Sequence, residues 1–442
     1  MNRRILHLAV PSIISNITVP LLGLVDVAIT GHMGEAGYMA AIAVGSMVFN
    51  IIYWLFSFLR FGTGGMTAQA YGKGDGGEAR ILFRSWLTSA LIAMTIIALQ
   101  MPLFRLAMWF VHPDEEIVET IHTYYNICIW GTLPSLSLYT LTGWFVGMQN
   151  TKLPMLVSIT QNIVNICLSC LFVYILGMKI EGVALGTLTA QWCGALMAMV
   201  LIRTRYAGVC ERLNIRKDLI PTLKSIILPR RWQEGSKDYV PDNSGKVNTT
   251  LFIRTLFLIA VNLYFIEAGA RGGAVILAVN SVLMQMFILY TYVMDGFAFA
   301  AEALCGRYHG AGEHENFRMA YRGIWMWAAG LATAYTLAYA LGGTFFLNML
   351  TDDASVRMAA GEYLPWAIAI PFCGVAAFVL DGVFVGLTKT IGMMWGTFGG
   401  AVTFFLIYLT LYPSLHNHAL WLAFNAYLFM RGVVQGIVML RS

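Results

Sequence analysis

Long windows of apolar residues with no charge constrain this sequence more than any other feature. Residues 87–103, for example, contain no Lys, Arg, Asp or Glu. Charged residues make up only 12% of the 442 residues, about half of the ~25% found in ordinary soluble domains. A soluble fold cannot bury so many uncharged windows of about 20 residues, which is the length that crosses a bilayer. We therefore expect an integral membrane protein.

About twelve such windows follow one another along the chain. Inside a bilayer, only helices and closed barrels satisfy their backbone polar groups, and these windows are too long for barrel strands. The sequence thus predicts an all-α polytopic membrane protein with about twelve transmembrane helices. The expected spans are 7–30, 40–66, 85–110, 118–146, 154–177, 183–203, 251–268, 274–304, 319–349, 358–386, 392–412 and 418–439.

Lysine and arginine alternate between loops in a way that predicts the orientation. Most of them fall in loops on the side of the N-terminus, while Lys179, Arg271 and Arg357 fall on the other side. Cytoplasmic loops of membrane proteins carry this excess, so we expect both termini on the cytoplasmic side of the membrane. The net charge of +5 follows from this topology, and we expect no nucleic-acid partner.

An internal repeat divides the chain into halves. Residues 142–151 read TGWFVGMQNT and residues 381–390 read DGVFVGLTKT, 239 positions later, while 72–75 and 310–313 match at an offset of 238. Matching loops lie on the same side of the membrane in both halves. This pattern predicts two six-helix lobes related by a pseudo-two-fold axis along the membrane normal, an arrangement that transporters use to place sites between halves. The expected division is 1–204, a cytoplasmic linker 205–250, and 251–442.

Asp26 is the carboxylate of the first half that lies clear of the span ends. An ionisable residue at membrane depth is costly and is a functional candidate by default. A low-dielectric setting favours the protonated form of a lone carboxylate, so Asp26 could load and release a proton or hold a cation. The alternative is an aspartate solvated at the outer rim of the membrane.

Polar residues on the fifth and sixth spans could complete a pocket beside Asp26. Asn165 and Ser169 share a helix face, Asn162 adjoins Asn165, and Thr187 on the next span could join them. Together they would form an oxygen-rich site. The alternative is that these side chains only link neighbouring helices by hydrogen bonds.

Further candidates occur within other spans. Asp295 and Glu302 share a helix face, Asp381 opens the repeated DG motif and Thr142 has the matching position in the first half. Arg60 and Arg431 could pair with carboxylates or extend towards the inner surface. The second-lobe and substrate-site candidates are Asp295, Asp381, Thr142 and Arg60.

Pro11 and Pro20 in the first span remove backbone hydrogen bonds and can bend it. A bend there could serve gating or could be static. The sequence lacks the ATP-binding GxxxxGK[ST] and the hydrolase motifs HExxH and GxSxG, so we expect neither enzymatic activity nor a cofactor. The CxxC at Cys167 and Cys170 lies in an apolar window and is interpreted as packing.

Several segments together resemble the multidrug and toxic compound extrusion (MATE) family, in particular its DinF-like bacterial branch. They are LAVPSII and VDVAITGHMG near the start, FGTGGMTAQAYGKGD after the second span, FVGMQNTKLPM after the fourth and LDGVFVGLTKT after the tenth. The resemblance covers nearly the whole chain. It implies proton- or sodium-coupled antiport that expels organic, often cationic, compounds.

The resemblance also implies roles for individual residues. Asp26 matches the ion-coupling aspartate of the branch, Asn165 and Thr187 match its asparagine and threonine, and Pro11 matches the proline that bends the first span. Where many relatives carry a second acid, this sequence has Ser169. The loss favours protons over sodium, although a sodium site at Asp26, Asn165 and Thr187 stays possible.

The function predicted from the sequence is therefore a proton-coupled secondary antiporter that exports small organic compounds, with Asp26 as the coupling carboxylate. The alternatives are a sodium-coupled antiporter, a lipid-linked oligosaccharide flippase of the same superfamily, and a non-transporting membrane enzyme or scaffold. The expected partners are small-molecule substrates and the lipid bilayer, and we expect a monomer.

Overall fold

The computed structural model describes residues 1–31, 36–212, 215–227 and 244–441, without the side chains of 19–28, 30, 36, 215–218 and 227. Within these residues every regular element is a helix, and no strand occurs. The prediction of an all-α chain is confirmed. The chain forms two compact units, Ile14–Gly245 and a second unit that joins Met1–Ile13 to Lys246–Ser442.

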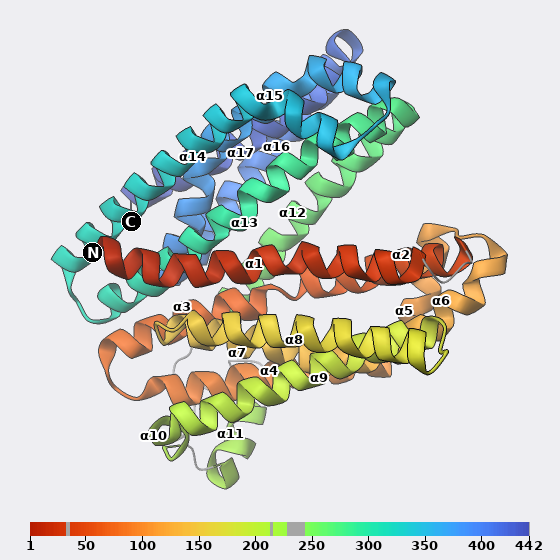
Figure 1. The fold of residues 1–442 in the computed structure, drawn as a ribbon. Helices are drawn as coiled ribbons and strands as arrows, with labels where there is room; N and C mark the ends of the chain where they lie inside the picture. Colours follow the sequence, from red (N-terminus) through yellow and green to blue (C-terminus); the bar gives the residue numbers. More distant parts are fainter. Residues whose placement is uncertain (32–35, 213–214, 228–243, 442) are drawn as a thin grey trace. The chain divides into compact units, whose positions relative to one another are not determined.

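The unit Ile14–Gly245 contains a bundle of helices that lie side by side (Figure 1, red to yellow-green). It takes most of α1, which also contributes its first residues to the other unit. Its helices are α1 (Asn2–Gly31), α2 (Ala36–Leu55), α3 (Phe58–Lys73), α4 (Gly77–Ala98), α5 (Gln100–Val111), α6 (Glu115–Cys128), the 3₁₀ turn η1 (Ile129–Gly131), α7 (Thr132–Gly147), α8 (Lys152–Cys170), the π-helical turn η2 (Leu171–Ile175), α9 (Ile180–Arg205), α10 (Ala207–Cys210) and α11 (Ile215–Ile227).

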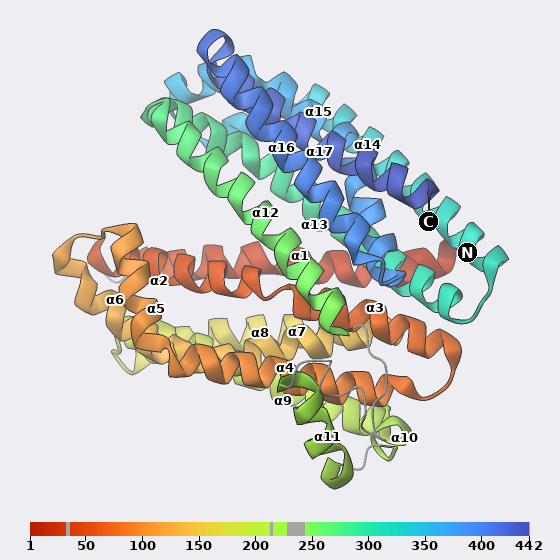
Figure 2. The same cartoon turned by 180° about the vertical axis from the view of Figure 1, so that it is seen from behind.

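The second unit contains longer, less interrupted helices (Figure 2, green to blue). They are α12 (Ser244–Arg271), α13 (Ala274–Gly310), α14 (His314–Leu350), α15 (Ala354–Gly386), α16 (Thr390–Leu415) and α17 (Asn417–Leu440). Asp353 caps α15 by accepting hydrogen bonds from the Ser355 and Val356 amides. The Ser355 hydroxyl, which donates to the same carboxylate, and these amides hold the pKa of Asp353 below its ordinary value.

The helices agree with the expected spans, with local differences. In the described part of the chain, ten helical stretches are long and apolar enough to cross a membrane. The helix α1 and the continuous run from α6 through η1 to α7 are long enough to serve as the other two. The second span is broken near residues 56–57 into α2 and α3, and the segment expected as a linker contains α10 and α11.

The internal repeat is visible in the backbone. After α7, Gln149 has a left-handed conformation with φ 62°, and after α15 Thr388 has φ 53°. Such angles are uncommon for residues other than glycine. At both places an amide donates back across the turn, from Asn150 to the Phe145 carbonyl and from Lys389 to the Phe384 carbonyl. The two halves thus end corresponding helices with the same turn.

Corresponding glycines let helix pairs approach closely in both units. A Cβ on Gly147 of α7 would lie 2.7 Å from the Gly64 carbonyl of α3, and a Cβ on Gly386 of α15 would lie 2.6 Å from the Glu302 carbonyl of α13. In a membrane, helices gain little from the hydrophobic effect and associate through close contact of small residues. These glycines therefore determine how near each helix pair can pack.

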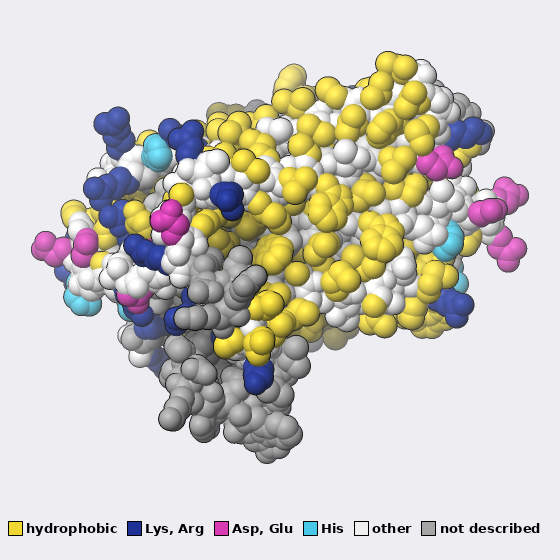
Figure 3. Space-filling model, turned by 90° about the horizontal axis from the view of Figure 1, so that it is seen from below, with side chains coloured by type: hydrophobic (Ala, Val, Ile, Leu, Met, Phe, Trp, Pro, Cys, Tyr) yellow, Lys and Arg dark blue, Asp and Glu magenta, His cyan; other side chains and the backbone are white. Residues whose placement is uncertain are grey.

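Charge is unevenly distributed along the helix direction. Figure 3 shows Lys and Arg concentrated at one end of the visible face, Asp and Glu prominent at the other, and hydrophobic side chains covering the surface between them. A lipid-facing belt between two polar ends is what a membrane-spanning helix bundle requires.

Candidate functional site

The first polar cluster lies between α8 and α9, within the unit Ile14–Gly245. The Asn165 side-chain amide donates a hydrogen bond of 3.0 Å to the Thr187 hydroxyl. Asn165 and Ser169 are almost fully buried. The Asn165 Oδ1 and Ser169 Oγ atoms have no hydrogen-bond partner among the described residues. The cluster therefore offers two buried oxygens whose hydrogen-bonding capacity is unfilled, which is unusual in native structures.

Gly186 explains how α8 and α9 come so close at this cluster. A Cβ at this position would overlap the Ser169 hydroxyl and would lie 2.9 Å from the Ser169 backbone nitrogen. Immediately beyond Ser169 and Cys170, α8 changes to the π-helical turn η2. π-helical turns are rare in proteins overall, and those that occur often lie at functional sites.

Hydrogen bonds fix the register of α8 against α1. The Asn162 amide donates to the Thr18 carbonyl at 3.2 Å, and the Thr18 and Ser158 hydroxyls lie 3.4 Å apart. Further along both helices, the Tyr174 hydroxyl donates to the Ile29 carbonyl at 3.5 Å. The two helices thus run parallel, and these contacts bracket the turn of α1 around residue 26. The side chains of Asp26 and Pro20 lie outside the described residues.

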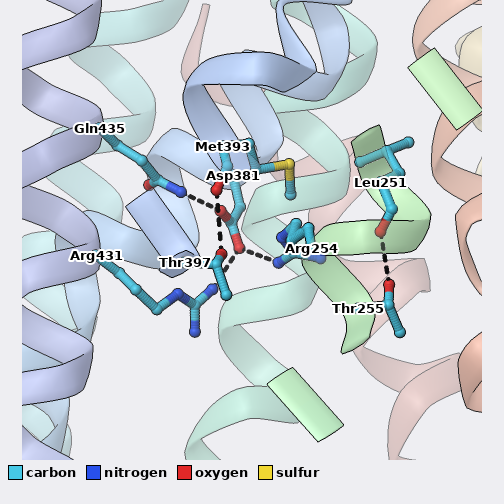
Figure 4. A network of polar contacts seen from close by, with 8 residues as sticks. All are labelled: Leu251, Arg254, Thr255, Asp381, Met393, Thr397, Arg431 and Gln435. Carbon is cyan, nitrogen blue, oxygen red and sulfur yellow. Dashed lines mark hydrogen bonds and ion pairs between the residues drawn. The ribbon is translucent and has the colours of Figure 1, made fainter. Parts of the chain in front are cut away.

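The second polar cluster lies in the other unit and is built around Asp381 of α15 (Figure 4). Arg254 of α12 and Arg431 of α17 donate to the same Asp381 oxygen at 2.5 and 2.7 Å. Gln435, one turn after Arg431, donates to the other oxygen at 2.6 Å. All four residues are at least nine-tenths buried. Of the two alternatives for Arg431, pairing with a carboxylate or extension towards the inner surface, the structure shows the pairing.

The Asp381 cluster contains one carboxylate and two guanidinium groups, and so has one positive charge in excess. The Nε atoms of Arg254 and Arg431 and the Gln435 Oε1 atom are buried and have no hydrogen-bond partner within the described part of the chain. Charges removed from water are stabilised only by close pairing and hydrogen bonds. Asp381 is therefore already neutralised by its neighbours. Its part in substrate or ion handling stays a prediction.

Sequence reasoning did not select Arg254 or Gln435. Arg254 lies only a few residues inside the expected seventh span, 251–268, next to the basic segment that precedes it. Two signals could have found them: membrane-depth charges usually pair with one another, and Gln435 lies four residues after Arg431, on the same helix face.

The remaining candidates are separate from these clusters. Asp295 is half-buried on α13, and Glu302 is fully buried two turns later. Thr142 is half-buried on α7. Arg60 is buried on α3, with its guanidinium 4.1 Å from the Phe61 ring centroid. Pro11 is buried within α1, and the helix continues through it.

Comparison with known proteins identifies the family. The MatE family profile matches residues 11–171 and 249–409, two segments that start 238 positions apart and so reproduce the internal repeat. The chain is 33% identical over 428 residues to the DNA damage-inducible protein F of Escherichia coli, covering 97% of this chain and 89% of that protein. It is 25% identical to a probable multidrug resistance protein NorM of Photorhabdus laumondii, covering 88% and 82%.

Solved structures show the same fold. A crystal structure of MATE in the bent conformation matches with a TM-score of 0.84 and 17% identity, covering 99% of this chain and 94% of that chain. An outward-facing multidrug resistance MATE family transporter also matches with a TM-score of 0.84, at 18% identity, covering 100% and 95%. These matches agree with the two-lobe, all-α architecture of the present chain. The protein belongs to the MatE family, the MATE multidrug efflux transporters.

Proposed function

We propose that the protein is a secondary antiporter that exports small organic compounds in exchange for protons, with Asp26 as the coupling carboxylate. The observation that carries this proposal is the Asn165–Thr187–Ser169 cluster, with its two buried and unpartnered oxygens. A buried polar group without a partner costs free energy. Oxygens left open in this way are suited to receive a proton-bearing group or a cation.

The register of α1 supports Asp26 as the group that uses these oxygens. Since Thr18 pairs with residues 158 and 162, and Ile29 pairs with Tyr174, the turn of α1 around residue 26 lies level with the part of α8 that carries Asn165 and Ser169. Protonation would remove the charge of Asp26 and allow its carboxyl to donate to an open oxygen. Loss of the proton would restore a negative charge, which a cationic substrate could balance.

Protons are favoured over sodium because the cluster contains neutral oxygens and one carboxylate at most. A cation needs several oxygen ligands and a compensating charge, whereas a proton needs one basic oxygen. The membrane potential contributes about 2.3 kcal/mol per 100 mV for each net charge moved, so exchange of one proton for one cation is driven by the pH difference, and exchange for a neutral compound by both. We propose a monomer in the bacterial inner membrane, with both termini cytoplasmic and without a cofactor or enzymatic activity.

Dye efflux from proteoliposomes tests the coupling. Proton and sodium gradients are imposed separately. We expect protons that enter down their gradient to drive efflux of a cationic dye, and we expect a sodium gradient to drive little efflux. Asp26→Asn should lower proton-driven efflux at least tenfold, because an amide cannot release a proton. Glu115→Gln, a change of the same chemistry at an exposed outer position, should retain efflux.

Three results would count against the proposal. Efflux that follows the sodium gradient would favour sodium at the same cluster. Unchanged efflux by Asp26→Asn would remove the aspartate from the mechanism. Transport of a lipid-linked oligosaccharide in place of dyes would favour a flippase.

A further inference from the structure

A cavity of about 480 Å³ opens at the start of α14 in the second unit. It is lined by His314, Glu315, Arg318, Met319 and Arg322. His314, Arg318 and Arg322 are spaced four residues apart, so they lie in one row along the helix. The lining of the cavity therefore consists of a row of three nitrogen-bearing side chains, one carboxylate and one apolar side chain.

The donors in this row are free to bind a ligand. The side chains of His314, Arg318 and Arg322 make no hydrogen bond or ion pair with a described residue, and both arginines are exposed. Two guanidinium groups beside one carboxylate give the cavity a net positive charge. The amino end of α14 adds the positive end of a helix dipole.

The first turns of α1 bring further positive charge to this region. They pack against α14, since a Cβ on Gly323 would lie 2.7 Å from the Ile5 side chain. In the same turns, the Arg4 guanidinium donates to the Tyr308 hydroxyl at 2.8 Å. The surroundings of the cavity thus favour an anion.

Beyond the cavity, α14 exposes large hydrophobic side chains to its surroundings. Met326, Leu337, Leu341 and Phe345 are all exposed large hydrophobic side chains. The 37 residues of α14 span about 55 Å, whereas the hydrocarbon core of a bilayer is about 30 Å thick. The helix is long enough for its first turns to lie at headgroup level while these side chains lie along the lipid chains.

We propose that this cavity binds the phosphate of an anionic phospholipid from the inner leaflet. Arginine side chains pair with phosphate oxygens through two parallel hydrogen bonds, and basic pockets at the cytoplasmic ends of helices suit anionic headgroups. The exposed hydrophobic side chains of α14 and Met319 would contact the acyl chains, which a soluble phosphate lacks. This site is separate from the proposed coupling cluster, and its test does not depend on transport.

Lipid binding to the purified full-length protein tests this inference. Phosphatidylglycerol and phosphatidylcholine are added to the protein in detergent, and bound lipid is measured by native mass spectrometry together with the melting temperature. The wild type should bind phosphatidylglycerol more tightly and be stabilised by it. Arg318→Gln with Arg322→Gln should weaken that binding at least tenfold, since each basic residue near a membrane surface contributes roughly fivefold. Arg318→Lys with Arg322→Lys should retain part of it.

The matched control is Arg203→Gln with Arg205→Gln, which removes two exposed positive charges from the end of α9. This variant should bind phosphatidylglycerol like the wild type. Equal loss in both double variants would mean general attraction to anionic lipid and would overturn the site. So would equal binding of phosphatidylcholine, or displacement of phosphatidylglycerol by millimolar glycerol phosphate, which would indicate a soluble ligand. Melting temperatures in phosphatidylcholine show whether each variant is folded.

Discussion

At the scale of single residues, Asp381 holds two buried arginines from different helices. Asp381→Asn would leave Arg254 and Arg431 as two buried cations without a counter-charge. Breaking a buried ion pair from one side costs about 3–5 kcal/mol. Arg254→Gln should cost less, because a neutral pair of Arg431 and Asp381 remains. We therefore expect the melting temperature in detergent to fall in the order wild type, Arg254→Gln, Asp381→Asn.

The control is Glu362→Gln, which removes a carboxylate that is exposed on α15. Exposed ion pairs contribute little, so this variant should melt like the wild type. If Asp381→Asn also melted like the wild type, the arginines would have another source of charge compensation and the account of the cluster would be wrong.

At the scale of helices, the contact between α13 and α15 depends on Gly386. Gly386→Ala would place a methyl group 2.6 Å from the Glu302 carbonyl and 2.9 Å from the Gly306 nitrogen. Both are backbone atoms and cannot move without shifting a helix, so we expect a loss of about 1–3 kcal/mol. A fall in the melting temperature of the purified protein is the expected result.

Gly330→Ala in α14 provides the comparison, because a Cβ there meets no atom within 4 Å. Alanine is the better helix former by about 1 kcal/mol, so this variant should melt at the same or a slightly higher temperature. Equal destabilisation by both substitutions would show that loss of glycine itself, and not the close helix contact, is responsible.

Periodicity and hydropathy predict elements well but side-chain partners poorly. The spans and the repeat follow from windows of about 20 residues, which the bilayer requires regardless of tertiary detail. Asn165 and Thr187 lie on adjacent spans, which made a contact between them one of the alternatives that the sequence offers. Arg254 and Asp381 are 127 residues apart, and the sequence does not state which of several buried charges faces which. The break between α2 and α3 was also missed, because hydropathy continues through it.

At the scale of the whole molecule, the distribution of charged loops predicts a defined orientation. Asp75, in the turn after α3, should face the cytoplasm, and Asp114, before α6, should face outward; both are exposed. We expect Asp114→Cys to react with a membrane-impermeant thiol reagent in intact cells. Asp75→Cys should react only after permeabilisation.

The wild-type protein, with its seven native cysteines, measures the background for this labelling. If Asp75→Cys reacted in intact cells and Asp114→Cys did not, the orientation would be the opposite of the predicted one. That result would also move the cavity at the start of α14 to the outer leaflet, since the two loops belong to corresponding positions of the repeat.

The glycine contacts and left-handed turns recur in both halves, whereas the Asp381 cluster does not, because Thr142 stands at its position in the first half. The two halves therefore share a backbone scaffold but differ in the chemistry of their interiors. The first half contains neutral buried oxygens without a partner among the described residues, whereas the second half contains buried charges that pair with each other. Two copies of the same half could form the helix scaffold. Such a protein would lack either the neutral oxygen cluster or the Asp381 cluster.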